Sequence, residues 1–150
     1  MSLVPLLNDD QADPAARAVF ADIRACRGTD HVNNIWRALA NDPSQLAATW
    51  GEVKRVMAPG ALDALTKELV YIAVSAANNC SYCLHTHTAA ARAKGMSEAM
   101  FSELMQVVYL ASQTNRIAIG LQVEVDARYA PPSPRAAVQR GGARRSRSGS

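Results

Sequence analysis

The sequence predicts an all-α protein of about six or seven helices. Apolar residues recur at spacings of three and four along most of the chain, which is typical of helices with one buried face. Capping residues, prolines and glycines mark the starts and ends of these segments, and no stretch of convincing length alternates as a β-strand does. Apolar residues make up 49% of the chain and aromatic residues only 5%, so we expect a core built mostly of Ala, Leu, Val and Ile.

The first helix is expected to start at Asp13-Pro14, because aspartate caps the first turn and proline is tolerated at the first helical position. Gly28 is expected to end it, and Cys26 to be a small buried residue on its apolar face. A short helix over residues 31–40 follows. Its inward-facing residues are expected to be Ile35, Trp36 and Leu39.

Three further helices are predicted in the middle of the chain. One starts at Asn41-Asp42-Pro43 and is broken by Pro59-Gly60. Another starts near Asp63 and ends at Asn78-Asn79. The third starts near Cys80 and stops at Gly95, because glycine favours the end of a helix.

The C-terminal part is expected to add two helices and a tail. Ser97 caps the first of them, and the second is expected from about Thr114 to Ala127. Residues 131–150 are rich in Pro, Arg, Ser and Gly, a composition typical of disorder. The expected organisation is therefore one helical domain over residues 1–130 and a disordered tail over residues 131–150.

Charge and cysteine content narrow the classes of function. The net charge of +3 comes from five arginines after Ala130, without which 11 basic residues face 13 acidic ones, so we expect no nucleic-acid partner. No run approaches the roughly 18 apolar residues of a membrane span, and residues 1–10 lack the pattern of a signal peptide. Three cysteines do not suit a secreted disulfide framework, so we expect a cytoplasmic protein.

A Cys-x-x-Cys pair opens the helix expected from Cys80 to Gly95. On a helix, Cys83 lies about 60° from Cys80 around the axis and His87 falls between them, so the three share one face, whereas His85 points away from it. The first turn of a helix favours a thiolate, and Cys80 lies nearest to that end. His87 can take or return a proton, and Glu68, beside the buried stripe of the preceding helix, is expected to complete a relay.

These residues resemble the alkylhydroperoxidase D-like branch of the carboxymuconolactone decarboxylase family. The likeness covers roughly residues 32–113 and rests on Glu68, Cys80-x-x-Cys83, His87 and Gly95 in register. It implies an all-helical fold that forms a homo-oligomer, a trimer or hexamer. It also implies a thiol-dependent peroxidase that cycles between dithiol and disulfide, without metal or flavin. The partners are then a peroxide, either hydrogen peroxide or an alkyl hydroperoxide, and a dithiol electron donor.

Within this resemblance, Cys83 is similar to the thiol that attacks the peroxide and Cys80 to the proton donor and resolving thiol. His87 and Glu68 are similar to the proton relay. One position differs: well-known members have histidine two residues after the first cysteine, where this chain has Tyr82. Tyrosine, with an ordinary pKa of about 10, is a poor proton shuttle at neutral pH.

Three other interpretations remain open. The same dithiol suits a protein disulfide reductase or an electron adaptor for another protein. Cys80, Cys83 and His87, with His85 or His31, are also possible zinc ligands. Finally, buried cysteines can serve as small apolar residues in a helical scaffold without turnover.

Overall fold

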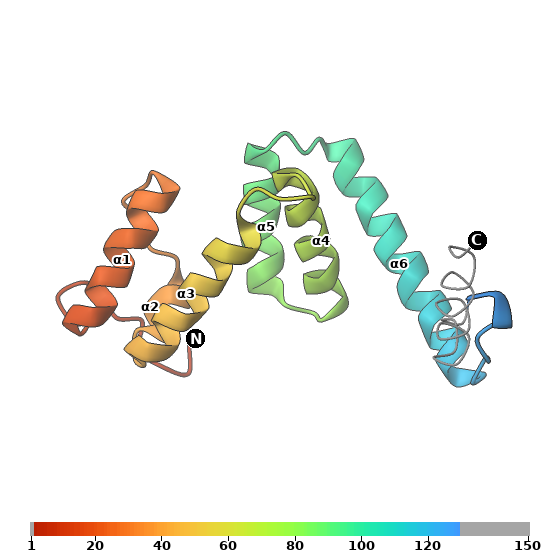
Figure 1. Cartoon of the computed structure of the whole chain (residues 1–150), viewed down its shortest axis with the longest axis horizontal. Helices are drawn as coiled ribbons and strands as arrows, with labels where there is room; N and C mark the ends of the chain where they lie inside the picture. The colour runs from red at the N-terminus through yellow and green to blue at the C-terminus, as the bar shows by residue number, and fades with distance from the viewer. Residues whose placement is uncertain (1, 130–150) are drawn as a thin grey trace, which may run out of the picture. The chain divides into compact units, whose positions relative to one another are not determined.

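The computed structural model describes residues 2–129, and within them it contains α-helices, one short 3₁₀ helix and no strand (Figure 1). The predicted all-α class is confirmed. The predicted tail over residues 131–150 lies outside the described residues. The helices are α1 (Pro14–Arg27), α2 (Asn34–Leu39), α3 (Pro43–Met57), α4 (Ala64–Ala77), α5 (Ser81–Ala93), α6 (Glu98–Gly120) and the 3₁₀ helix η1 (Ala127–Tyr129).

Three aspartates cap helix starts where the sequence predicts them. Asp13 accepts a hydrogen bond from the first turn of α1, Asp42 from two N–H groups of α3, and Asp63 from the Thr66 N–H of α4. These bonds satisfy N–H groups that have no partner within the helix. α1 ends at Gly28, whose φ of 62° is a left-handed conformation that glycine adopts without strain.

A hydrophobic core lies among α1, α2 and α3. Phe20 and Ile23 of α1 pack with Leu46 of α3, and all three are fully buried. Trp36 of α2 meets Trp50 of α3 edge to face, with ring centroids 5.3 Å apart. Aromatic pairs favour this geometry, so the two tryptophans join the short α2 to the longer helices.

Two residues expected in this core lie at the surface. Cys26 is exposed, because the buried stripe of α1 leads to Arg27, whose guanidinium lies over the Trp36 and Trp50 rings. Ile35 is 44% exposed, because Trp36 takes the inward position of a helix only six residues long. Both predictions were wrong.

The predicted break near Thr114 is also wrong, because α6 continues through it to Gly120. The Thr114 hydroxyl bonds back to the Leu110 and Ala111 carbonyls of the same helix, so this residue fits within a helix. The chain turns after Gly120, where Gln122 has a φ of 50°, and no helix reaches from Thr114 to Ala127.

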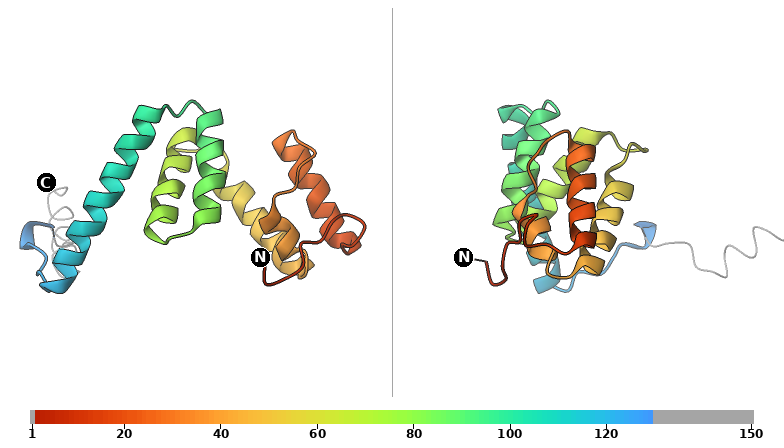
Figure 2. Two further views of the ribbon diagram at one scale, coloured as in Figure 1. Left: turned by 180° about the vertical axis from the view of Figure 1, so that it is seen from behind. Right: turned by 90° about the vertical axis from the view of Figure 1, so that its left-hand side faces the viewer.

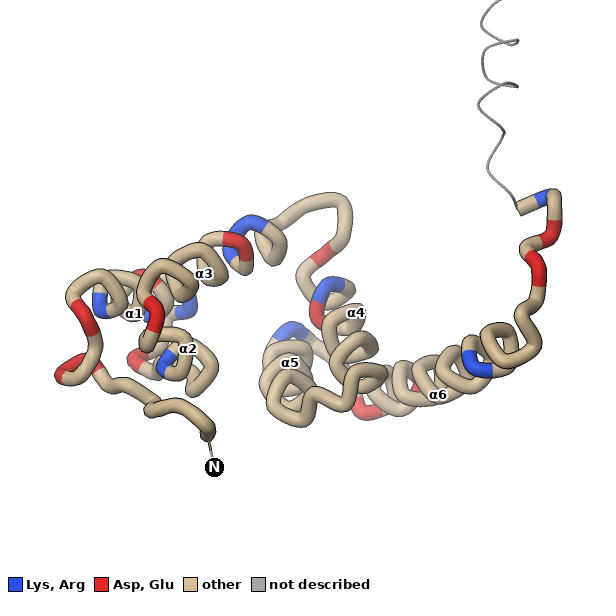
Figure 3. The backbone as a smooth tube through the Cα atoms, turned by 90° about the horizontal axis from the view of Figure 1, so that it is seen from below, with Lys and Arg blue, Asp and Glu red and all other residues tan. Residues whose placement is uncertain are grey.

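The described part of the chain divides into two compact units, one that ends at Phe101 and one that begins at Ser102. The first unit holds α1 to α5, in which α4 and α5 pack side by side (Figure 2). Acidic and basic residues are interspersed along these helices (Figure 3). The second unit holds most of α6, in which no residue is buried. Among the described residues, no helix has the length and apolar character needed to cross a membrane.

Candidate active site

The α4–α5 segment carries the four residues predicted to be catalytic, Glu68, Cys80, Cys83 and His87, whereas His31, named as a possible zinc ligand, precedes α2. α4 ends at Ala77, and the chain turns through Asn79, whose φ of 56° is left-handed. The Cys80 N–H then bonds to the Ser75 carbonyl at 2.9 Å, which ties the start of α5 to the last turn of α4. This short connection places the first turn of α5 beside the last turn of α4.

The two cysteines contact each other at the N-terminus of α5. Cys80 is the N-cap residue, and its sulfur accepts a hydrogen bond from the Cys83 N–H at 3.4 Å. Hydrogen bonding from the Cys83 side chain and then from its N–H lowers the pKa of the Cys80 thiol below its ordinary value. Burial, followed by the interaction with Cys80, raises the pKa of the Cys83 thiol to about 11. Cys80 is therefore the first of the two to become a thiolate.

A buried carboxylate on α4 binds two basic side chains of the α5 segment. Glu68 is only 5% exposed. Its Oε2 lies 2.7 Å from His87 Nδ1, and its Oε1 accepts a hydrogen bond from Lys94 Nζ at 2.9 Å. Burial alone would raise the pKa of Glu68, but the hydrogen bonds from His87 and Lys94 outweigh burial and hold this pKa below its ordinary value.

This contact fixes which ring nitrogen of His87 carries a proton. An ionised carboxylate can only accept hydrogen bonds, so the Nδ1 that contacts Glu68 bears the hydrogen. Nε2 of a neutral imidazole is then the nitrogen with a free lone pair. A carboxylate behind a histidine orients catalytic bases in this way, so the arrangement can take up and return protons.

Tyr71, one turn after Glu68 on α4, stacks on the His87 ring. The ring centroids lie 3.5 Å apart with the planes at 17°. Burial, and then negative charge on Cys83, Cys80 and Glu68, raises the pKa of the Tyr71 hydroxyl. Tyr71 therefore belongs to the same cluster as His87 and Glu68.

The structure thus pairs Cys80 with Cys83 and Glu68 with His87, as the sequence predicts, and the catalytic role of these four residues stays a prediction. Sequence reasoning missed Tyr71 and Lys94. Their spacing offered a signal, because Tyr71 follows Glu68 by three residues and Lys94 follows His87 by seven, which keeps each on the face of its partner.

Two neighbouring side chains lie outside this cluster. His85 is exposed and its Nδ1 lies 2.8 Å from the Ser81 carbonyl of its own helix. The Tyr82 hydroxyl accepts a hydrogen bond from the Ile35 N–H of α2 at 3.2 Å. Within residues 2–129, no group of three or more His, Cys, Asp or Glu side chains is arranged to hold a metal ion.

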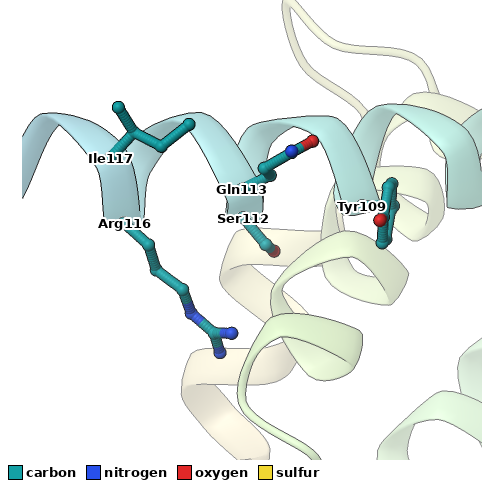
Figure 4. A pocket seen from close by; sticks show the side chains of 5 residues that line it. All are labelled: Tyr109, Ser112, Gln113, Arg116 and Ile117. Carbon is teal, nitrogen blue, oxygen red and sulfur yellow. The ribbon is translucent and has the colours of Figure 1, made fainter.

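A surface pocket of about 380 Å³ lies on α6 (Figure 4). Its lining residues are Tyr109, Ser112, Gln113, Arg116 and Ile117. All of them come from one helix, and none belongs to the dithiol cluster.

Comparison with known proteins identifies the family. The model of the carboxymuconolactone decarboxylase family matches residues 44–123, which include both cysteines, Glu68 and His87. The chain belongs to the carboxymuconolactone decarboxylase family. The family resemblance inferred from the spacing of these residues is confirmed.

Three known proteins are similar to this chain. The crystal structure of the alkylhydroperoxidase AhpD core from Rhodospirillum rubrum is 53% identical, covers 88% of this chain and 99% of its own, and superposes with a TM-score of 0.84. Alkyl hydroperoxide reductase AhpD of Solibacter usitatus is 32% identical over 113 residues, or 73% of this chain. Uncharacterized protein 4 in the cox locus of Paracoccus denitrificans is 33% identical over 60 residues, or 40% of this chain. The chain spans 62% and 51% of the lengths of these last two proteins.

Proposed function

We propose that this protein is a thiol-dependent peroxidase that reduces hydrogen peroxide or alkyl hydroperoxides with the Cys80/Cys83 dithiol. The observation that carries the proposal is the contact of His87 Nδ1 with buried Glu68, one turn beyond the cysteine pair on α5. A dithiol of unequal thiol pKa values next to an oriented imidazole is suited to thiolate chemistry. Similarity to two proteins named for alkyl hydroperoxide reduction supports a peroxide as the substrate.

The proposed cycle begins when His87 Nε2 removes one proton from the dithiol and leaves one thiolate shared by the two sulfurs. A proton passes from Cys83 to Cys80, and the Cys83 thiolate attacks a peroxide oxygen. The O–O bond breaks, Cys83 becomes a sulfenic acid, and the Cys80 thiol protonates the leaving alkoxide to give an alcohol, or water from hydrogen peroxide.

The second half of the cycle forms the disulfide. The Cys80 thiolate attacks the Cys83 sulfur and displaces hydroxide, which takes the proton held by His87 and leaves as water. The two sulfurs have then lost the two electrons that the peroxide gained. A dithiol donor restores the pair by thiol–disulfide exchange, and a reducing compartment such as the cytoplasm would supply one.

The difference between the two thiols suits this division of roles. Cys80, with the lowered pKa, is the stronger acid and therefore the better proton donor to an alkoxide. Cys83, with a pKa of about 11, forms the more nucleophilic thiolate once its proton has moved, because nucleophilicity rises with thiol pKa.

Peroxide consumption by single-cysteine variants tests the proposal. We expect Cys83→Ser to consume no peroxide, and Cys80→Ser to consume one equivalent and stop with a sulfenic acid on Cys83 that dimedone traps. Cys26→Ser is the matched control, because Cys26 is exposed on α1 outside the site, and it should match the wild type. Undiminished turnover in Cys83→Ser would overturn the assignment.

A protein disulfide reductase or electron adaptor is the second candidate. It is favoured by the same pKa order, because Cys80, the first thiolate to form, lies at the N-terminus of α5 as the attacking thiol of a disulfide-exchange protein would. Turnover with a protein disulfide that exceeds turnover with an organic peroxide would favour this function.

The partners would include other copies of this chain. α6 spans 23 residues without burying one, and several of its apolar side chains are exposed, among them Val107, Leu110, Ile117 and Ile119. A helix of this length normally buries an apolar face, so we propose that α6 packs in a homo-oligomer, a trimer or hexamer. Light scattering should show a smaller species for Leu110→Asp, whereas Gln106→Asp on the same helix should keep the wild-type mass.

A further inference from the structure

Lys94 occupies a fixed position at the end of α5. It is the C-cap residue, and the Met96 N–H behind it bonds to the Ala91 carbonyl at 3.0 Å while the Met96 side chain is buried. Gly95, with a φ of 96°, permits this reversal of the chain. The turn therefore sets the direction of the Lys94 side chain, which returns toward α4.

The Lys94 ammonium spans the two helices to reach Glu68. Nζ lies 2.9 Å from Oε1, while Oε2 of the same carboxylate binds His87 Nδ1 at 2.7 Å. Each carboxylate oxygen thus has one basic partner. The Lys94 side chain is 37% exposed, whereas that of Glu68 is 6% exposed, so the lysine supplies a charge from the edge of the site to a group inside it.

The charge of Lys94 opposes proton uptake by the Glu68–His87 pair. A buried carboxylate without a cationic neighbour binds a proton more readily, and an imidazole beside a cation binds its second proton less readily. The other titratable groups near the pair are Tyr71 on α4 and the two cysteines at the start of α5. None of them is a cation at neutral pH, so Lys94 supplies the positive charge among the described contacts of Glu68.

We propose that Lys94 is a positioning residue of this site, which keeps Glu68 ionised and thereby holds His87 in the tautomer whose Nε2 can accept a proton. The residue acts through Glu68 and touches neither the peroxide nor the sulfurs. The expected effect of Lys94 on turnover rests on the proposed peroxidase function. Its effect on the protonation of the Glu68–His87 pair does not, because that protonation can be measured without peroxide.

The test compares the neutral variants Lys94→Gln and Lys94→Met with the conservative variant Lys94→Arg. Glutamine keeps a hydrogen-bond donor to Oε1 but removes the charge. Lys67→Met is the control, because Lys67 also comes from the helix pair but donates to the carbonyls of Val56, at 2.8 Å, and Ala58. The His87 imidazole signals are followed by ¹⁵N NMR from pH 5 to 9, and circular dichroism checks the fold.

We expect the pH midpoint of proton uptake by the pair to rise by about 1–3 units in both neutral variants, the range typical for loss of an adjacent opposite charge. The midpoint of the acidic limb in the pH profile of kcat/KM should move to higher pH by the same amount. Lys94→Arg and Lys67→Met should keep the wild-type midpoint.

An unchanged midpoint in folded Lys94→Gln or Lys94→Met would overturn the proposal. Unfolding of both neutral variants while Lys94→Arg folds would also overturn it, in favour of a purely structural lysine. If the wild type consumes no peroxide, the proposed function fails, and the NMR titration still decides the role of Lys94.

Discussion

The imidazole of His87 lies flat against the ring of Tyr71, with centroids 3.5 Å apart and planes at 17°. Glu68 holds Nδ1 of the same imidazole from its edge. The ring is thus restrained both in its plane and perpendicular to it, so its Nε2 keeps one direction. A base held in this way needs little reorganisation when it accepts a proton.

The stacking contact predicts different outcomes for two Tyr71 variants. Tyr71→Phe keeps the ring and should retain most peroxide turnover. Tyr71→Leu removes the ring, frees the imidazole, and should lower the free energy of unfolding by about 0.5–1.5 kcal/mol beyond the loss of buried area. Urea denaturation and peroxide kinetics measure the two effects. Equal turnover in Phe and Leu variants would show that the stacking has no part in orienting His87.

The unequal thiols predict an order of alkylation. Cys80 should react with iodoacetamide at a lower pH than Cys83, because the thiolate is the reactive form and the pKa of Cys83 is about 11. Mass spectrometry of peptides after brief alkylation between pH 6 and 10 measures this order, with Cys26 as an exposed reference. Alkylation of Cys83 before Cys80 would contradict it.

Glu68 should make stability depend on pH in the acidic range. The pKa of Glu68 is lower in the folded protein than its ordinary value, so the folded state binds the proton less readily than the unfolded state. Its stabilising contribution is therefore present above the unfolded pKa, about 4.3, and is lost as pH falls through the folded pKa.

Glu68→Gln isolates this contribution. Glutamine keeps the shape but not the charge, so the variant should be less stable than the wild type at pH 7, and the gap should narrow as the pH falls toward 3. Turnover should fall by about 10²–10⁴-fold, the typical contribution of a general acid–base group. Urea denaturation at a series of pH values measures the gap. A gap that widens toward low pH would contradict the sign of this pKa shift.

Much of the candidate site could be predicted from the sequence, because the positions of its residues depend on spacing within single helices. Cys80 and Cys83 share a turn of α5, and an aspartate cap marks the start of α4, so the facing positions of Glu68 and His87 follow from periodicity. The contact of Lys94 with Glu68 depends instead on how α4 and α5 pack and on the reach of a long side chain. Helix periodicity places Lys94 on the same face as His87, but it specifies neither the packing of the two helices nor the reach of the lysine side chain.

The wrong expectations have a similar cause. Cys26 fits the apolar pattern of α1, but the long side chain of Arg27 covers the tryptophan rings in its place. A new helix was predicted from about Thr114, yet the Thr114 hydroxyl bonds back to the preceding turn of a continuing helix. The local sequence is compatible with both the predicted and the observed placements of Cys26 and Thr114. Contacts with the rest of the chain determine which placement occurs.

Tyr82 links the dithiol helix to α2 and predicts a structural effect without a chemical one. The N-cap residue of α2, Asn33, makes no side-chain cap bond, and the Tyr82 hydroxyl accepts the Ile35 N–H in the first turn instead. Tyr82→Phe leaves this N–H without its partner, which should cost about 0.5–1.5 kcal/mol of unfolding free energy.

Peroxide turnover should be unchanged in Tyr82→Phe, because this hydroxyl points to α2 and not to the Glu68–His87 pair. Tyr129→Phe in η1 is the matched control, since the Tyr129 side chain is exposed and lies outside both α6 and the dithiol cluster, so its change should alter neither stability nor turnover. The measurements are urea denaturation and initial rates for the two variants. Loss of turnover in Tyr82→Phe at unchanged stability would instead place this hydroxyl in the proton relay.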